Sequence, residues 1–183
     1  ESGLRTSRRM SHVFVMDVSY YHKPLFLSDA AINIFPDLAV KKDIVQNAID
    51  LFIALGFGTP KVGIISATEE VNSAIPSTLD ATALCKMSDR EQIKGGILDG
   101  PLAFDLAISK ESANIKHIKS EVAGDADIII TPDIESGNML YKQMAFLAKA
   151  ESAGIVLGAK IPIILTSRSS DPESRKASCA MAL

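Results

Sequence analysis

The sequence predicts an α/β fold in which a largely parallel sheet is sandwiched between two layers of helices. Short apolar runs rich in β-branched residues alternate with amphipathic segments along almost the whole chain, which is the pattern of a βα series. The later apolar runs contain almost no polar residues, as is typical of strands buried on both faces. The length of 183 residues, 47% of them hydrophobic, suffices for one such domain and part of a second.

The first two predicted strands enclose a turn that contains proline. Residues 12–18 (HVFVMDV) are β-branched and aromatic, and residues 25–31 (LFLSDAA) follow the turn at Lys23-Pro24, so both read as strands. We expect the two strands to be neighbours that open the sheet. The sequence leaves open whether they are antiparallel.

Helices and strands then alternate as far as the C-terminus. Residues 41–55 repeat apolar side chains at steps of three and four, which predicts an amphipathic helix that Gly56 ends. Residues 101–112 are predicted to be a helix with proline in its first turn. The other expected elements are strands at 62–67, 96–99, 127–132, 155–158 and 161–166, and helices at 77–90, 137–151 and from Asp171 or Pro172 onward.

Composition and charge exclude several classes of protein. The chain has 19 Lys and Arg against 22 Asp and Glu, a net charge of -3, whereas a nucleic-acid binder normally presents a basic face. No apolar run approaches the roughly 20 residues that cross a bilayer, and the N-terminal residues do not form a signal peptide. We therefore predict a cytoplasmic protein that binds neither nucleic acid nor membrane. Because the chain begins with Glu, we also expect a piece of a longer protein.

Several familiar catalytic patterns do not occur in the sequence. Two cysteines, Cys85 and Cys179, provide neither a disulfide framework nor a zinc site. The three histidines show no Ser/His/Asp order and no metal-ligand spacing. Gly95-Gly96 lacks the spacing of a phosphate-binding fingerprint. We therefore predict that the site contains no metal.

Polar residues follow four of the predicted strands, where ligands bind in parallel sheets. These clusters are Ser28-Asp29, Asp99-Gly100-Pro101, Thr131-Pro132-Asp133 with Ser136-Gly137-Asn138, and Ser167 to Asp171. Ser136-Gly137-Asn138 is predicted to open a helix, whose free N–H groups favour an anion such as phosphate. The alternative is that Ser136 and Asn138 only cap that helix. A lone Asp in such a loop is more often a helix cap than a base, and this alternative applies to Asp99 and to Asp133 taken singly.

The last cluster combines three groups that phosphate chemistry needs. Arg168 offers a bidentate fork for phosphate, Ser167 a hydrogen-bond donor, and Asp171 a carboxylate that can act as a general base. The alternative interpretation is a solvated helix start. These three residues are our candidates for the catalytic residues.

Four blocks of sequence resemble the phosphate acetyltransferase/phosphate butyryltransferase family. The blocks are DAAINIFPDL (29–38), DGPLAFD (99–105), PDIESGNMLYKQ (132–143) and AGIVLGAKIPIILTSR (153–168). They occur in the family's order and span the chain from about residue 5 to its end. The branch that looks most similar is the phosphate acyltransferase part of bifunctional enoyl-CoA hydratase/phosphate acetyltransferase proteins.

The resemblance implies a three-layer α/β/α sandwich, mainly parallel and similar to isocitrate and isopropylmalate dehydrogenases. It implies a homodimer of two-domain subunits with the site between the domains. Residues 1–157 would then be the second, inserted domain. Residues 158–183 would return to the first domain, whose N-terminal portion is absent from this chain.

The implied reaction converts acyl-CoA and phosphate into acyl phosphate and coenzyme A through a ternary complex. Coenzyme A is then a substrate, and no cofactor is bound. By the resemblance, Arg168 binds phosphate, Ser167 donates a hydrogen bond and Asp171 is the candidate base. The family pattern Ser-Arg-Gly-x-Ser-x-x-Asp differs here, because Asp171 comes early and Ser174 takes the usual carboxylate position. Residues matching the family's cleft, and therefore predicted to bind coenzyme A or phosphate, are Gly137, Asn138, Asp99, Gly100 and Pro101, with Asp133 beside them.

Two other interpretations of function remain beside the acyltransferase. The chain can be a truncated, catalytically inactive module that binds coenzyme A and dimerises. A metal-dependent dehydrogenase of the related superfamily is disfavoured, because no D-x-x-x-D pair follows Asp133 on a helix. The sequence does not decide between acetyl and butyryl as the acyl group.

Overall fold

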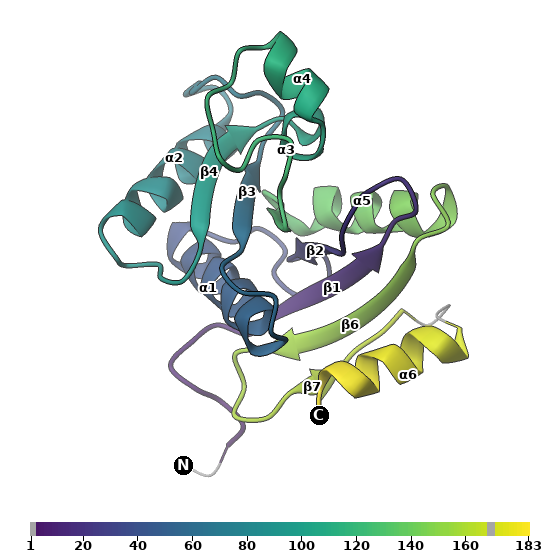
Figure 1. The fold of residues 1–183 in the computed structure, drawn as a ribbon. Helices are drawn as coiled ribbons and strands as arrows, with labels where there is room; N and C mark the ends of the chain where they lie inside the picture. Colours follow the sequence, from purple (N-terminus) through teal and green to yellow (C-terminus); the bar gives the residue numbers. More distant parts are fainter. Residues whose placement is uncertain (1–2, 168–170) are drawn as a thin grey trace.

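The fold is a seven-stranded mixed sheet covered by helices on both faces, as a computed structural model shows for residues 3–167 and 171–183 (Figure 1). The strands lie in the order β4-β3-β5-β2-β1-β6-β7. Their bounds are β1 Ser11–Asp17, β2 Leu25–Ser28, β3 Lys61–Ile65, β4 Ile97–Leu102, β5 Ile128–Ile130, β6 Glu151–Leu157 and β7 Ile163–Ile164. The helices are α1 Leu38–Ala54, α2 Pro76–Asp89, α3 Phe104–Ile108, α4 Lys110–Ile115, α5 Ile134–Phe146 and α6 Pro172–Met181.

The sheet divides into a parallel half and an antiparallel half. Strands β4, β3, β5 and β2 pair in parallel, with β5 held between β2 and β3 over its whole length. Strand β1 pairs antiparallel with both β2 and β6, and β7 pairs antiparallel with β6. The neighbouring first strands expected from the sequence are confirmed, and their orientation is antiparallel.

Helices cover the two faces of the sheet through two separate apolar clusters. On one face α1 and α2 pack on a cluster that includes Phe26, Val62 and Ile128. On the other face α3 and α5 pack on a cluster that includes Leu27 and Ile129. Because neighbouring residues of a strand point to opposite faces, both faces of β2 and β5 are buried. The predicted α/β sandwich is confirmed.

Two sequence-based element assignments were wrong. The strand expected at 96–99 continues through Gly100 and Pro101 to Leu102 as β4, and the helix expected at 101–112 is replaced by the short helices α3 and α4. Pro101 can belong to a strand because β4 is at the edge of the sheet, where a missing N–H removes no ladder hydrogen bond on the open side. The second error concerns the helix expected at 137–151 and the strand expected at 155–158. Helix α5 begins three residues before the expected start and ends at Phe146, and β6 already begins at Glu151.

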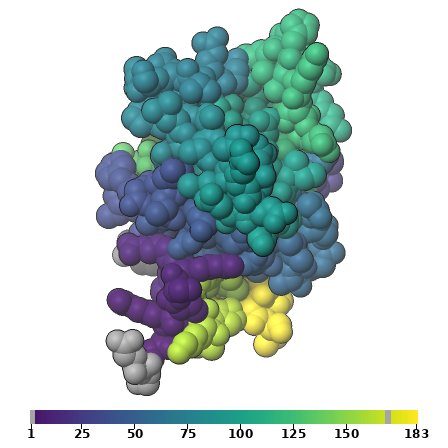
Figure 2. Space-filling model, turned by 90° about the vertical axis from the view of Figure 1, so that its left-hand side faces the viewer, coloured from purple at the N-terminus to yellow at the C-terminus, as the bar shows by residue number. Residues whose placement is uncertain are grey.

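The C-terminal region forms the other edge of the sheet. The apolar run expected as a strand at 161–166 contributes only Ile163–Ile164 to the sheet, and α6 lies along β6 (Figure 1). The N-terminal residues lie against the turn after β6 (Figure 2), where Arg5 bridges to Ala159 and the Lys160 N–H donates to the Leu4 carbonyl at 2.8 Å. In this chain residues 158–183 therefore extend the same sheet as residues 11–157. Their assignment to a separate first domain stays a prediction.

Candidate active site

The loops after β2 and β5 meet at the carboxyl ends of these two parallel strands. Ser28 and Ile130 are paired in the ladder, and the Thr131 N–H continues it by donating to the Ser28 carbonyl at 2.8 Å. The Thr131 hydroxyl then donates to the Asp29 carbonyl at 3.3 Å. Two of the four polar clusters predicted from the sequence are therefore in direct contact.

The Asp29 carboxylate organises the loop that follows β2. It is 3% exposed and accepts hydrogen bonds from the N–H groups of Ala31, Ile32 and Asn33 at 2.9–3.1 Å. The Asn33 side-chain amide donates to it as well, at 2.6 Å, and also donates to the Met10 carbonyl at 2.9 Å. These four hydrogen bonds tie consecutive residues of the loop to one buried side chain. Asp29 therefore fixes the shape of the loop.

Asp133, not Ser136 or Asn138, caps helix α5. Its carboxylate accepts from the Ser136 N–H at 2.8 Å and from the Ser136 hydroxyl at 2.9 Å. The Ile134 N–H donates to the Ile34 carbonyl at 3.1 Å. These first-turn donors, which were expected to face an anion, are thus engaged within the protein. The helix dipole still favours negative charge at this end.

Gly137 and Asn138 allow α5 to approach the loop after β2 closely. A Cβ atom on Gly137 would lie 2.7 Å from the Thr131 hydroxyl and 2.8 Å from the Asp29 carbonyl oxygen, closer than packed atoms come. The Asn138 side-chain amide donates to the Ala30 carbonyl at 3.1 Å. A glycine inside a helical sequence pattern is the feature that marks this contact in the sequence.

The Asp99-Gly100-Pro101 cluster lies on the edge strand β4, and β3 separates this strand from β5. The Asp99 carboxylate accepts from the Gly100 N–H at 2.8 Å. A Cβ on Gly100 would lie 2.7 Å from the Ile64 Cβ, so the glycine permits close strand packing. The nearby Cys85 has a pKa raised to about 12 by burial and by the charges of Asp99 and Asp89, so its thiol is neutral at physiological pH.

Two of the three predicted catalytic residues lie on the antiparallel half of the sheet. Ser167 is half-buried, Arg168 lies outside the described residues, and Asp171 caps α6 by accepting from the Ser174 N–H at 2.7 Å. That hydrogen bond holds the pKa of the Asp171 carboxyl below its usual value. Asp171 is therefore ionised at neutral pH and is a weak base.

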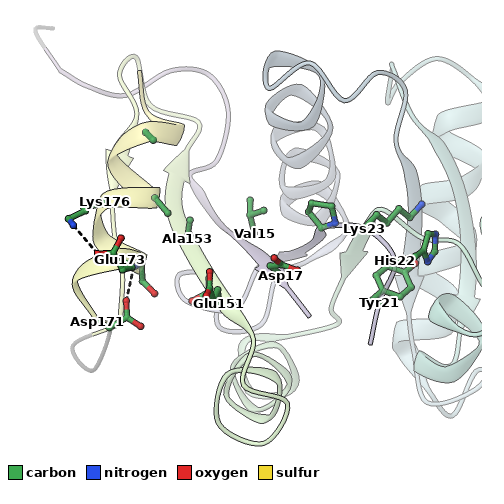
Figure 3. Close-up of a pocket in the computed structure, with 15 residues that line it drawn as sticks. Val15, Asp17, Tyr21, His22, Lys23, Glu151, Ala153, Asp171, Glu173 and Lys176 are labelled. Atoms are coloured by element: carbon green, nitrogen blue, oxygen red, sulfur yellow. Dashed lines mark hydrogen bonds and ion pairs between the residues drawn. The ribbon is translucent and has the colours of Figure 1, made fainter. Parts of the chain in front are cut away.

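Asp171 lines a hollow of about 810 Å³ between α6 and the strands β1 and β6 (Figure 3). Asp17 and Glu151 form its floor, and Tyr21, His22 and Lys23 face Asp171 and Glu173 across it (Figure 3). Asp17 and Glu151 are paired at the end of β1 and the start of β6, whereas β2 ends next to the other end of β1. The chain as described does not bring Asp171 together with Asp133, Gly137 and Asn138.

His12 is a buried polar residue that the sequence interpretation did not select. It lies in β1, is 0% exposed, and its Nε2 atom is 2.7 Å from the Leu165 carbonyl oxygen, two residues before Ser167. A lone histidine at the start of an apolar strand resembles an ordinary core residue. Only the fold brings it to the candidate catalytic segment.

Within the described residues no group of three or more His, Cys, Asp or Glu side chains could hold a metal ion. In the same residues no helix has the length and apolarity needed to cross a membrane.

The fold and these loops define an α/β protein with polar residues gathered beyond the carboxyl ends of its parallel strands, where such proteins bind ligands. Residues 2–182 match the family described as "Phosphate acetyl/butaryl transferase", and the chain belongs to that family.

Relatives and solved structures support the same assignment. A phosphate acetyltransferase of Rhizobium meliloti is 61% identical over 99% of this chain and 57% of its own length. A phosphate butyryltransferase of Clostridium acetobutylicum is 47% identical over 100% of this chain and 60% of its own. A branched-chain phosphotransacylase from Enterococcus faecalis V583 superposes with a TM-score of 0.89 at 35% identity, covering 98% of this chain and 64% of that one. The chain thus spans somewhat over half the length of these curated relatives.

Proposed function

We propose that this chain is the part of a phosphate acyltransferase that carries the candidate catalytic residues, in an enzyme converting acyl-CoA and phosphate into acyl phosphate and coenzyme A. The observation that carries the proposal is the match along the whole chain to relatives named phosphate acetyltransferase and phosphate butyryltransferase. Relatives with both names align over the same residues. We therefore propose acetyl or butyryl as the transferred group.

The chemistry is a direct acyl transfer within a ternary complex. A phosphate oxygen attacks the thioester carbonyl carbon, a new C–O bond forms, and the C–S bond breaks to release the coenzyme A thiolate. In the reverse direction the thiolate attacks the acyl phosphate, so a base must first take the thiol proton, whose pKa is about 8.5 by analogy with cysteine. Negative charge builds up on the carbonyl oxygen and on the phosphate in the transition state, where hydrogen bonds and a cation are most effective.

We assign the catalytic roles to the cluster at the end of the apolar run 161–165. Arg168 is proposed to bind phosphate, Ser167 to donate to the carbonyl oxygen, and Asp171 to accept the thiol proton. Because Asp171 is ionised, its carboxylate can accept the thiol proton. Its lowered pKa makes this proton transfer energetically unfavourable. Because Asp171 lines an open hollow, a ligand can reach its carboxylate.

The loops beyond β2 and β5, together with the edge strand β4, are proposed to form the wall that binds coenzyme A and phosphate. Asp133, Gly137 and Asn138 would shape the wall at the start of α5, and Asp99, Gly100 and Pro101 would shape it at β4. Their observed hydrogen bonds run within the protein. We therefore propose that they act by shape and by the dipole of α5 rather than by direct charge.

The same proposal includes the assembly and the location. We propose that the enzyme is a cytoplasmic homodimer, that residues 158–183 rejoin a first domain, and that coenzyme A is a substrate rather than a bound cofactor. The shorter length of this chain relative to its relatives supports the need for further residues to complete the cleft.

The test is phosphate-dependent release of coenzyme A from acetyl-CoA and from butyryl-CoA. It is measured for the 183-residue chain and for a chimera in which this chain replaces the matching 181 residues of the R. meliloti relative. We expect activity in the chimera. Changing Arg168→Ala there should raise the KM for phosphate and lower kcat, because the cation meets phosphate in both the ground and transition states.

The outcomes separate the two candidate functions. Activity in the chimera but not in the isolated chain supports the acyltransferase, and it means that the 183 residues alone form an incomplete active site. Binding of coenzyme A by the chain, with no turnover in the chimera, would favour the inactive binding module. An active chimera whose phosphate KM and kcat do not change in Arg168→Ala would remove the phosphate role from that residue.

A further inference from the structure

The segment that leads to Ser167 contacts a buried histidine of β1. His12 pairs with Val156 in the β1-β6 ladder, and its ring packs against Phe14 with the ring centroids 4.2 Å apart. Phe14 in turn stacks on Tyr141 of α5, with centroids 3.8 Å apart. The imidazole is thus fixed in position by rings that belong to both β1 and α5.

The hydrogen bond of His12 specifies its protonation state. A carbonyl oxygen only accepts, so the Nε2 atom, 2.7 Å from the Leu165 oxygen, must carry the proton. The Nδ1 atom is buried and has no partner among the described residues. Burial lowers the pKa of the ring and outweighs both that hydrogen bond and the Asp29 charge. A neutral imidazole protonated on Nε2 satisfies these contacts.

Gly154 provides the space in which His12 meets Leu165. A Cβ at this position would lie 2.5 Å from the Leu165 carbonyl oxygen and 3.0 Å from two atoms of the His12 ring. The Gly154 N–H donates to the Ser178 hydroxyl of α6 at 2.9 Å, and that hydroxyl donates to the Ser174 carbonyl at 2.8 Å. Hydrogen bonds therefore hold the chain against β1 at Leu165, before Ser167, and against β6 at Ser178, after Asp171.

We propose that His12 is a positioning residue, whose Nε2–H holds the Leu165 carbonyl and so fixes Ser167 relative to the sheet. The inference rests on the proposed function, in which Ser167 donates to the reacting carbonyl oxygen. Only Thr166 lies between Leu165 and Ser167, so a displacement of the Leu165 backbone also displaces Ser167. A displacement of 1 Å at a reacting group can cost about 100-fold in rate.

The kinetic test uses the active chimera described above with two substitutions of the histidine. His12→Leu removes the donor, and we expect kcat to fall by about 10- to 100-fold, with the KM for acyl-CoA changed by less than about threefold. In His12→Gln the side-chain amide reaches the place of Nε2, so we expect much of the lost kcat to return. His117→Gln, at an exposed histidine, is the matched control and should leave kcat unchanged.

A comparison of His12→Gln with His12→Asn tests the inference even if His12→Leu does not fold. The amide of His12→Asn reaches the place of Nδ1 rather than Nε2, so we expect lower kcat in Asn than in Gln. Equal kcat in these two variants, or a higher value in Asn, would overturn the inference. So would a fall in kcat that follows the loss of thermal stability across all the variants.

A second measurement separates this inference from the proposed function. On the 183-residue chain, nitrogen NMR of the imidazole reports the tautomer, and hydrogen exchange reports the protection of the Thr166 and Ser167 amides. We expect protonation on Nε2 and faster exchange at both amides in His12→Gly than in the unmodified chain. Protonation on Nδ1, or unchanged exchange, would overturn the anchor even if the chimera is active. An inactive chimera with these expected spectra would overturn the proposed function and leave the anchor of the segment standing.

Discussion

The parallel and antiparallel halves of the sheet hold their polar residues in different ways. In the parallel half the Asp29 carboxylate, the Asp133 cap and the Asn138 amide are all engaged by the protein itself. In the antiparallel half Asp171 is an exposed cap beside an open hollow. The apolar side chains of Ile161 and Ile164 in this half are 52% and 44% exposed.

A buried core and a candidate catalytic segment can therefore belong to one sheet and yet be packed differently. In the parallel half the inner strands β2, β3 and β5 are buried almost throughout, and the polar side chains beyond β2 and β5 are hydrogen-bonded within the protein. The antiparallel half leaves apolar side chains at the edge of the sheet, which is typical of a surface that further protein covers. The following predictions test whether the two halves differ in stability as they differ in packing.

The largest effect is expected at the loop after β2. Asp29→Ala leaves the N–H groups of Ala31, Ile32 and Asn33 without their buried acceptor, and hydrogen bonds to a charged group are each worth about 1.5–3 kcal/mol. We expect the free energy of unfolding to fall by about 3 kcal/mol in urea titrations. Asp37→Ala, which removes a single exposed capping bond to Val40, should cost only about 1 kcal/mol. Equal losses in the two variants would contradict the organising role of Asp29.

A smaller loss is expected where α5 meets that loop. Gly137→Ala places a methyl group against the Asp29 backbone, and such overpacking costs about 1–3 kcal/mol, partly offset by the better helix propensity of alanine. Gly63→Ala is the matched control, because a Cβ there would meet only side chains at 3.5–3.6 Å. Chemical denaturation of both variants should show a clear loss for Gly137→Ala alone.

At the amino ends of the parallel strands, Asp125 is expected to make the free energy of unfolding depend on pH. Burial opposes ionisation of Asp125, but hydrogen bonds from Lys61, Lys23 and His22 outweigh it and hold the pKa of that carboxyl well below its usual value. The folded state therefore binds this proton less tightly than the unfolded state. The resulting stabilisation is complete above the unfolded pKa of about 4 and is lost as the pH falls below it.

We expect Asp125→Asn to flatten the dependence of the unfolding free energy between pH 5 and pH 2, lowering stability at pH 7 by about 1–2 kcal/mol. Asp89→Asn removes an ion pair with Lys86 in which both side chains are more than 60% exposed. Solvent screens this pair, so the pH profile should change much less than in Asp125→Asn. A profile that is equally steep in Asp125→Asn and in the unmodified chain would contradict the assignment.

The smallest effect is expected at the edge strand of the antiparallel half. Ile164→Thr replaces an apolar side chain that is nearly half exposed, so the unfolding free energy should change by less than about 0.5 kcal/mol. Ile155→Thr, on the neighbouring strand but 1% exposed, should cost several times more, because it buries a hydroxyl in an apolar cluster. Comparable losses would mean that β7 is packed as firmly as β6.

Periodicity was sufficient to predict most of the fold. The buried strands β2, β3 and β5 and the helix α1 follow directly from apolar runs and from steps of three and four residues. The error at Pro101 arose because proline is common at helix starts, and only the position of β4 at the edge shows why a strand tolerates it. The early start of α5 was missed because Asp133, rather than a serine, supplies the cap.

The candidate site could be predicted only where its residues are close in sequence or match a motif. Strand ends identified Asp133, Gly137 and Asn138, which the structure brings together with Asp29. The role of His12 could not be predicted, because its partner Leu165 is 153 residues away along the chain. The separation of Asp171 from the other cluster likewise depends on which strands pair, which local pattern does not determine.

The contact between β6 and the C-terminal residues is also expected to affect the solubility of the protein. Beyond the short pairing with β7, α6 lies along the outer side of β6. A fragment cut after residue 157 would present unpaired N–H and C=O groups beside Ile155 and Val156, and a bare edge of this kind recruits strands from other molecules. The C-terminal segment that Asp171 caps is therefore expected to keep this edge of the sheet from recruiting other strands, and cleavage in the turn at 158–162 is expected to make the protein more prone to precipitate.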